Sequence, residues 1–114
     1  MPNPNRYAAN ERRARSRLAQ LLHDHELIQG SLVTMTRECG KEGCRCTRGE
    51  KHVSQYLSVK IDGKRRMLYV PGDMVKDVRR RVEAYREVER LTETVSNACV
   101  ARVLEQKRKR KDNG

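Results

Sequence analysis

Three cysteines and one histidine, close together in the chain, are the residues best suited to chemistry. Cys39, Cys44 and Cys46 lie within eight residues, and His52 follows, which gives the spacing C-x4-C-x-C-x5-H. Three thiolates and one imidazole form a ligand set that tetrahedral Zn²⁺ prefers. The sequence therefore predicts a structural zinc site in a Cys-rich loop over residues 37–52.

These residues alone do not decide which side chain is the fourth ligand, or whether a metal is bound. His52 completes the set locally, whereas Cys99 offers a thiol from far along the chain. This spacing is less specific than paired C-x2-C motifs, and reduced thiols in a tight turn are the alternative reading. Structural disulfides are not expected, because no apolar secretory signal follows the initial Met.

Catalysis finds little support in the remaining polar residues. Asp62, Asp73 and Asp77 fall at an expected turn and an expected helix start, and His23 and His25 are two residues apart on a helix. Neither group converges on one point, as metal-assisted phosphodiester cleavage requires. We therefore expect a protein that is not an enzyme.

Excess positive charge is the second marked property of the chain. It has 114 residues, 26 Lys+Arg against 15 Asp+Glu, and a formal net charge of +11. The charge lies in clusters at 6–17, 37–51, 64–66, 79–81 and 107–111. Because such an excess favours a polyanionic partner, we predict nucleic-acid binding, with DNA favoured over RNA.

The predicted nucleic-acid contacts come from the Cys-rich loop, the hairpin that follows it and the two basic ends of the chain. Tyr56 and Tyr69 could stack on bases from one sheet face, the alternative being partial burial under a helix. The basic ends would contact phosphates and carry no sequence information. The predicted set is Arg12, Arg13, Arg45, Arg48, Lys51, Tyr56, Lys60, Lys64, Arg65, Arg66, Lys107, Arg108, Lys109 and Arg110.

The elements that must position these residues follow the order α-β-β-β-α. Apolar 3-4 spacing predicts a helix over 7–27, which Gly30 ends by adopting positive φ, with Ala14, Leu18, Leu21 and Leu22 buried. A short strand over 31–36 and a hairpin over 55–70 then follow. The predicted fold class is α+β, a small antiparallel sheet of about three strands between an N-terminal helix and a long C-terminal helix.

The hairpin is the clearest predicted element. Apolar and polar residues alternate from position 56 to 61, and Asp62-Gly63 predicts a type I′ turn. A two-residue turn makes Leu57 face Leu68 and Tyr56 face Tyr69. One face then holds Leu57, Val59, Ile61, Leu68 and Val70, and the other holds Tyr56, Lys60, Arg65, Met67 and Tyr69.

A long helix over residues 73–105 ends the predicted domain. The residues Val88, Leu91, Val95 and Ala98 repeat at heptad spacing, which predicts a helical seam. Its partner is either the N-terminal helix or a second subunit, so we expect a homodimer or a larger protein complex. The alternative function is an assembly protein that oligomerises through this seam and whose basic surface only steers partners.

The predicted organisation is a flexible arm over 1–6, one small domain over 7–105 and a disordered basic tail over 106–114. The core is thin, because the chain has no Phe or Trp and is only 36% hydrophobic. No apolar run approaches the roughly 18 residues that span a membrane, so we expect no membrane partner. We expect a cytoplasmic protein, associated with the nucleoid if it binds DNA.

Residues 37–52 read RECGKEGCRCTRGEKH. The segment resembles the signature R-x-C-G-K-x-x-C-x-C-x-x-G-x-x-H of a family of short bacterial and archaeal proteins of unknown function. Many members are associated with mobile elements, and the similarity continues through the hairpin into the last helix. The resemblance supports the domain boundary and the metal site, and it implies no activity.

A second resemblance concerns architecture. The hairpin sequence YLSVKIDGKRR over residues 56–66, followed by a helix, looks like the small three-stranded DNA-binding domains at the amino end of tyrosine recombinases. Those domains insert their sheet into the major groove, which is wide enough to admit a β-ribbon. Together the two resemblances imply an accessory role in a recombinase or transposition system.

Overall fold

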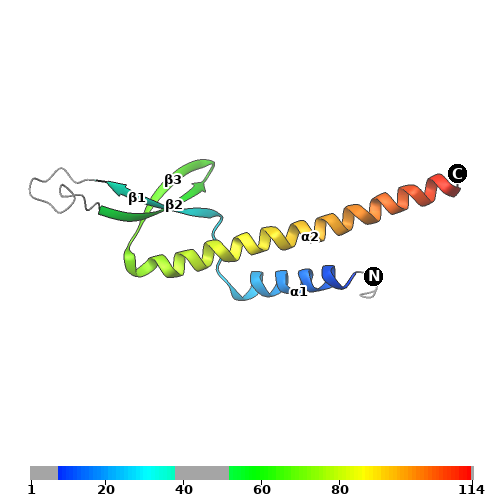
Figure 1. Ribbon diagram of the computed structural model, residues 1–114, viewed down its shortest axis with the longest axis horizontal. Coiled ribbons are helices and arrows are strands. Elements are labelled where there is room, and N and C mark those ends of the chain that lie inside the picture. The colour runs from blue at the N-terminus through cyan, green and yellow to red at the C-terminus, as the bar shows by residue number, and fades with distance from the viewer. Residues whose placement is uncertain (1–7, 38–51, 114) are drawn as a thin grey trace, which may run out of the picture. The chain divides into compact units, whose positions relative to one another are not determined.

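The computed structural model describes residues 8–37 and 52–113. The N-terminal helix α1 spans Ala9–Asp24, and the strands β1, β2 and β3 span Gly30–Arg37, His52–Ile61 and Lys64–Val70 (Figure 1). A 3-10 turn, η3, covers Gly72–Met74, and helix α2 spans Val75–Asn113. The predicted α+β class and the order α-β-β-β-α are confirmed. The arm predicted over 1–6 lies outside the described residues.

The three strands form one antiparallel sheet in the order β1-β2-β3. In β2 and β3, Tyr56 faces Tyr69 and Leu57 faces Leu68, so the predicted register is confirmed. The turn between them has φ of 52° at Asp62 and 81° at Gly63, the two positive values that type I′ requires. The turn chemistry therefore sets which side chains share a face of the sheet.

One face of the sheet is covered by the first turns of α2. Its buried core consists of Leu57, Val59, Val70, Val78 and Val82. Two other residues predicted for this face, Ile61 and Leu68, are 42% and 41% exposed. Ile61 directly precedes the turn and Leu68 lies on the edge strand β3, so both are at the margin of the covered area.

Gly30 has a different role from the predicted one. Helix α1 ends at Asp24, and Gly30 is the first residue of β1, opposite Val59. Among the described glycines only Gly63 has positive φ, so Gly30 is not a left-handed helix cap. A Cβ at Gly30 would lie 2.7 Å from the carbonyl oxygen of Ser58. Glycine is needed here because the chain approaches β2 closely.

Helix α2 is longer than predicted. Its 39 residues begin at Val75, after Asp73 in the 3-10 turn, and continue to Asn113 rather than stopping at 105. The basic residues 107–111 are therefore helical rather than a disordered tail. Lys and Arg are good helix formers and are favourable at a helix C-terminus, and Lys109 pairs with Glu105 one turn earlier at 3.8 Å.

The chain divides into two compact units where the sequence predicted one domain. The sheet unit is Leu27–Tyr85, and the helix unit is Met1–Glu26 with Arg86–Gly114. Helix α2 contributes to both, because its length exceeds what the small sheet can cover. Within residues 8–37 and 52–113, no helix is long and apolar enough to cross a membrane.

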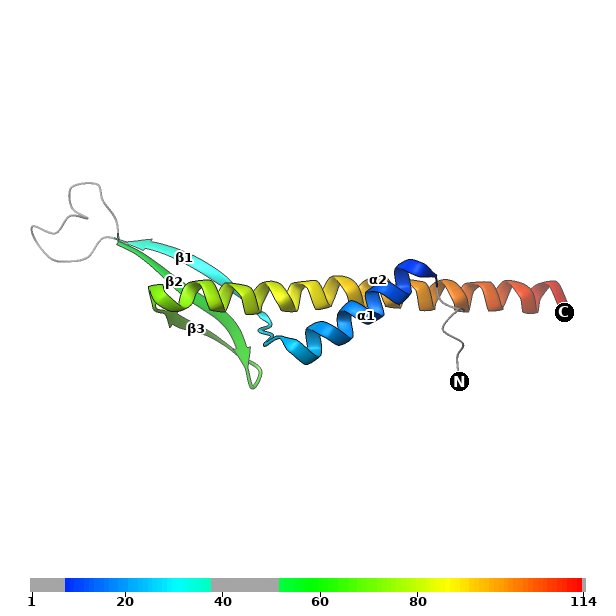
Figure 2. The same ribbon diagram turned by 90° about the horizontal axis from the view of Figure 1, so that it is seen from below.

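In the helix unit, α1 lies alongside the second part of α2 in both views (Figures 1 and 2). Arg17 Nε contacts Glu87 Oε1 at 3.0 Å across the pair. On α1, Leu21 and Ala14 are buried, whereas the predicted core residue Leu22 is exposed. A contact with one neighbouring helix buries only a narrow stripe, and Leu22 falls outside it.

The predicted helical seam of α2 has an intramolecular partner. Its residues Val88, Leu91, Val95 and Ala98 are all half-buried. The next heptad position is Arg102, whose guanidinium reaches Glu11 on α1. The N-terminal helix of the same chain lies along the seam in this structure, and a second subunit as its partner stays a prediction.

Candidate nucleic-acid interface

The second face of the sheet is the candidate interface. Residues that oppose each other in an antiparallel pair project to the same side, and this side alternates along the strand. The face opposite Leu57, Val59 and Val70 is called the open face here. Its residues are Ser31, Val33, Met35, Ser54, Tyr56, Ser58, Lys60, Arg65, Met67 and Tyr69.

Two tyrosines oppose each other on the open face, Tyr56 on the central strand β2 and Tyr69 on the edge strand β3. The ring centroids of Tyr56 and Tyr69 are 5.8 Å apart and their planes are at 70°, an edge-to-face contact. Tyr69 is 62% exposed and Tyr56 is half-buried. Neither lies under α2, since Val78 and Val82 of α2 pack on the other face. The Tyr69 ring is therefore available to a ligand.

Two cations oppose each other nearer the turn. Lys60 and Arg65 are register partners, and both are exposed. Arg65 Nη1 donates a hydrogen bond to Ser58 Oγ at 2.9 Å, and Ser58 is buried. Because Ser58 lies between Tyr56 and Lys60 on this face, the bond directs the Arg65 guanidinium towards the tyrosine pair.

None of the strand residues assigned to the open face is acidic. Its exposed side chains are the cations Lys60 and Arg65, the apolar or aromatic residues Met35, Met67 and Tyr69, and Ser31. This combination provides positive charge beside an aromatic ring. It matches a ligand that is both anionic and aromatic.

The four cations predicted in the hairpin do not all share this face. Lys64 opposes Ile61 and Arg66 opposes Val59, so both belong to the face that carries the apolar core. They are exposed, like Lys60 and Arg65. The sheet thus separates the predicted set into two pairs of equal charge on opposite faces.

The other predicted contacts are distributed among different segments. Arg12 and Arg13 are exposed on α1, and Lys107, Arg108, Lys109 and Arg110 are exposed on the last turns of α2, all in the helix unit. Arg45, Arg48 and Lys51 lie outside the described residues.

The predicted zinc ligands Cys39, Cys44 and Cys46 also lie outside the described residues. Strand β1 ends at Arg37 and β2 begins at His52, and these two residues are register partners. The backbone therefore brings Arg37 and His52, the residues that flank segment 38–51, together at one end of the sheet. Among residues 8–37 and 52–113, no three His, Cys, Asp or Glu side chains are grouped as a metal site.

The alternative fourth ligand, Cys99, lies in the helix unit on α2. Arg102 Nη2 donates to its Sγ at 3.3 Å, and Arg15 Nη2 at 3.7 Å. The thiol is thus contacted by two guanidinium groups in that unit.

The family of the chain is identified by a match that covers α1, the sheet and the start of α2. Residues 8–80 match the model of a family described as a domain of unknown function, DUF6788. The chain belongs to the DUF6788 family. A comparison with curated proteins found no match, and a comparison with solved structures found none either. The DUF6788 match names no metal, partner or activity, so the zinc site, the nucleic-acid contacts and the mobile-element association stay predictions.

The open face lies wholly within the DUF6788 match, whereas the seam of α2 and the basic residues 107–111 lie beyond it. The open face and the basic residues 107–111 are therefore separate along the chain.

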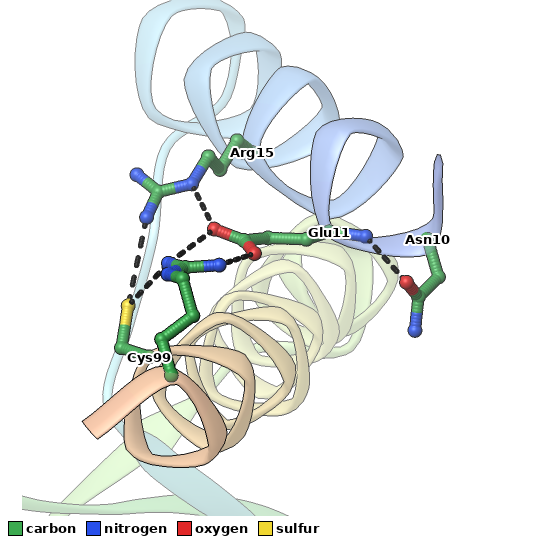
Figure 3. Close-up of polar contacts among 5 residues, drawn as sticks. Asn10, Glu11, Arg15 and Cys99 are labelled. Atoms are coloured by element: carbon green, nitrogen blue, oxygen red, sulfur yellow. Dashed lines mark hydrogen bonds and ion pairs between the residues drawn. The ribbon is translucent and has the colours of Figure 1, made fainter. Parts of the chain in front are cut away.

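Sequence reasoning missed one polar cluster, which is centred on Glu11 (Figure 3). The Glu11 side chain is fully buried. Arg102 contacts both its oxygens, Nη1 to Oε1 at 2.6 Å and Nη2 to Oε2 at 3.1 Å, and Arg15 Nε contacts Oε2 at 2.8 Å. Hydrogen bonding from Arg102, reinforced by Arg15, lowers the pKa of Glu11 to about 2 against desolvation, which acts in the opposite direction.

A signal for this cluster is present in the heptad pattern. Glu11 precedes Ala14, Leu18 and Leu21 at 3-4 spacing, and Arg102 follows Ala98 at the same spacing on α2. A charged residue at a seam position on each of two helices, with opposite signs, indicates that they pair with each other.

Proposed function

We propose that this chain is a nucleic-acid-binding module that uses the open face of its sheet, with DNA favoured over RNA. The supporting observation is that Lys60 and Arg65 lie on the same face as the exposed Tyr69, with no acidic strand residue among them. Cations on this face would neutralise phosphates while the ring contacts a base or sugar. The net charge of +11 favours such a partner at long range.

The basic ends of the chain would add affinity without specificity. Arg12 and Arg13 are exposed on α1, and residues 107–110 place four cations in succession at the end of α2. Contacts from these residues would fall on phosphates, which carry no direct sequence information. The proposal includes an accessory role in a recombinase or transposition system, and with it a location at the nucleoid.

Binding across a salt series tests this proposal. Labelled DNA and RNA are titrated with the full chain, and the logarithm of the binding constant is plotted against that of the salt concentration. We expect a steep negative slope, about 0.9 per neutralised phosphate on duplex DNA and about 0.7 on single strands. No binding at low salt, or a flat response to salt, would contradict the proposal.

We further propose that zinc stabilises the connection between β1 and β2, held by Cys39, Cys44, Cys46 and His52. The pairing of Arg37 with His52 supports this, because it brings the ends of the Cys-rich segment together. Zinc would supply folding free energy to a segment that is rich in Gly and charge.

Metal content of the purified chain tests the zinc proposal. The expected result is one zinc per chain in the wild type and its loss in Cys44→Ser, while Cys99→Ser keeps the metal, which excludes Cys99 as the fourth ligand. A wild-type chain purified without metal loss and free of zinc would overturn it.

An assembly protein is the second candidate function, supported by apolar side chains on α2. Val100, Val103 and Leu104 are more than half exposed, which leaves a helix surface for a second copy or a larger protein. The seam Val88–Ala98 would have to exchange α1 for that partner. Sedimentation of the full chain distinguishes the cases: a dimer supports assembly, and a monomer over the binding range contradicts it.

A further inference from the structure

We propose that the open face binds single-stranded nucleic acid, and that the ring of Tyr69 is the platform on which one unpaired base stacks. The inference rests on the proposed function and names its substrate class.

The exposure of Tyr69 is the first reason. Tyr69 is 62% exposed on the edge strand β3, and its ring makes an edge-to-face contact with Tyr56 on the central strand β2. The bases of a duplex already stack on one another and present only their edges in the grooves. Unpaired bases have free faces, and aromatic side chains are the usual partners of those faces.

The apolar residues around the tyrosines are the second reason. Met67 and Met35, on the same face, are 47% and 43% exposed, and Val33 opposes Tyr56. These side chains offer no hydrogen-bond donors for base edges, but they fit the flat face of a base. Apolar side chains beside cations therefore suit the unpaired bases of a single strand better than the hydrated groove of a duplex.

The spacing of the two pairs defines the size of the ligand. On β2, Tyr56 and Lys60 are four residues apart, which corresponds to about 13 Å along the strand. A ligand extended along β2 from the tyrosine pair to Lys60 would therefore be longer than one nucleotide. The hydrogen bond from Arg65 to Ser58 at 2.9 Å holds the guanidinium between the positions of Lys60 and Tyr56 on this face.

A protein ligand is the competing occupant of this face, since Tyr, Met and Arg are all enriched at protein interfaces. Charge favours the nucleic acid. The open face has cations and no acidic strand residue, and it belongs to a chain of net charge +11.

Affinity for one labelled sequence in two forms tests the inference. A single strand of about 16 nucleotides, as DNA and as RNA, is compared with the DNA duplex of the same sequence on the full chain. We expect tighter binding of a single strand than of the duplex. Tyr69→Ala should weaken single-strand binding about 5-fold to 150-fold, the range for loss of one stacked base.

Two variants serve as matched controls. Tyr69→Phe keeps the aromatic ring and should bind the single strand like the wild type. Ile61→Ala changes a partly exposed side chain, 42% against 62% for Tyr69, on the opposite face of the same hairpin, and should also leave binding unchanged.

Tyrosine fluorescence provides a second readout that does not depend on the alanine variant folding. The chain has four Tyr and no Trp, so its emission reports tyrosine environments directly. Single-strand binding should quench the emission, after correction for absorption by the nucleic acid. In Tyr69→Phe the quenched fraction should fall while the affinity stays the same.

The outcomes separate this inference from the proposed function. If the duplex binds as tightly as the single strands, or if Tyr69→Ala binds like the wild type, the single-strand inference is wrong while nucleic-acid binding stands. If neither form binds at low salt, both the proposed function and the inference are wrong, and a protein becomes the better candidate for this face.

Discussion

The two faces of the sheet unit carry side chains of opposite character on the same strands. On one face, Leu57, Val59 and Val70 are buried beneath α2, and on the other Tyr69 and Met67 are 62% and 47% exposed. The period-2 alternation of β-strands makes this separation possible in a hairpin of only two strands and a turn. Stability and ligand contact can therefore be changed independently by substitution on one face or the other.

Removing an apolar side chain should give the largest difference between the two faces in the free energy of unfolding. Leu57→Ala removes a buried side chain and should lower the free energy of unfolding by about 2–5 kcal/mol. Met67→Ala, on the other face of the same hairpin, should change it by no more than about 0.5 kcal/mol. Thermal unfolding followed by circular dichroism measures both. Equal shifts in Tm would mean that the open face is also covered by protein.

A smaller loss of stability is expected for a substitution at Gly30, where β1 begins. Gly30→Ala would bring a Cβ to 2.7 Å from the Ser58 carbonyl oxygen, a backbone atom that cannot move aside easily. Such overpacking costs about 1–3 kcal/mol. Gly72→Ala is the control, because its Cβ would have nothing within 4 Å. If both variants unfold like the wild type, the close approach of β1 to β2 at this point is wrong.

Local chemistry explains how much of this fold could be predicted. Asp62-Gly63 specified the turn, and the turn specified the register and both faces of the hairpin. The role of Gly30 could not be predicted, because a close approach between strands depends on the partner strand and not on neighbouring residues. The seam of α2 was predicted, but the choice of α1 as its partner depends on Glu11 and Arg102, which are far apart in sequence.

The candidate site was predicted only in part for the same reason. The predicted hairpin register placed Tyr56, Lys60 and Arg65 on one face, as the structure does. The predicted contact set still included Lys64 and Arg66, because it grouped the four cations by proximity in sequence rather than by face. The role of the predicted cysteine ligands stays a prediction, which the metal content of the purified chain would test.

The helix unit buries a carboxylate, whereas the core of the sheet unit is apolar. We expect this carboxylate to change the stability of the chain only at acidic pH. The pKa of Glu11 is about 2 in the folded chain, below its ordinary value of 4.5. A lowered pKa stabilises the fold above pH 4.5, and that stabilisation is lost as the pH falls towards 2. Unfolding monitored between these pH values should therefore show a decline attributable to Glu11.

Two variants identify the source of that decline. Glu11→Gln has no carboxylate to protonate and should lose this part of the pH dependence. Glu105→Gln, which removes a half-exposed partner of Lys109, should keep it. An unchanged pH profile in Glu11→Gln would show that the buried cluster is not responsible.

The most direct test of the open face as the binding surface compares two double variants of equal charge. Lys60→Ala with Arg65→Ala changes the open face, and Lys64→Ala with Arg66→Ala changes the opposite face. Each removes two positive charges from the same exposed hairpin. If the open face binds nucleic acid, the first double variant should reduce the salt slope by about 2 and weaken binding, whereas the second should retain the wild-type slope. Equal losses in the two double variants would contradict the account, because the hairpin would then act only through its total charge.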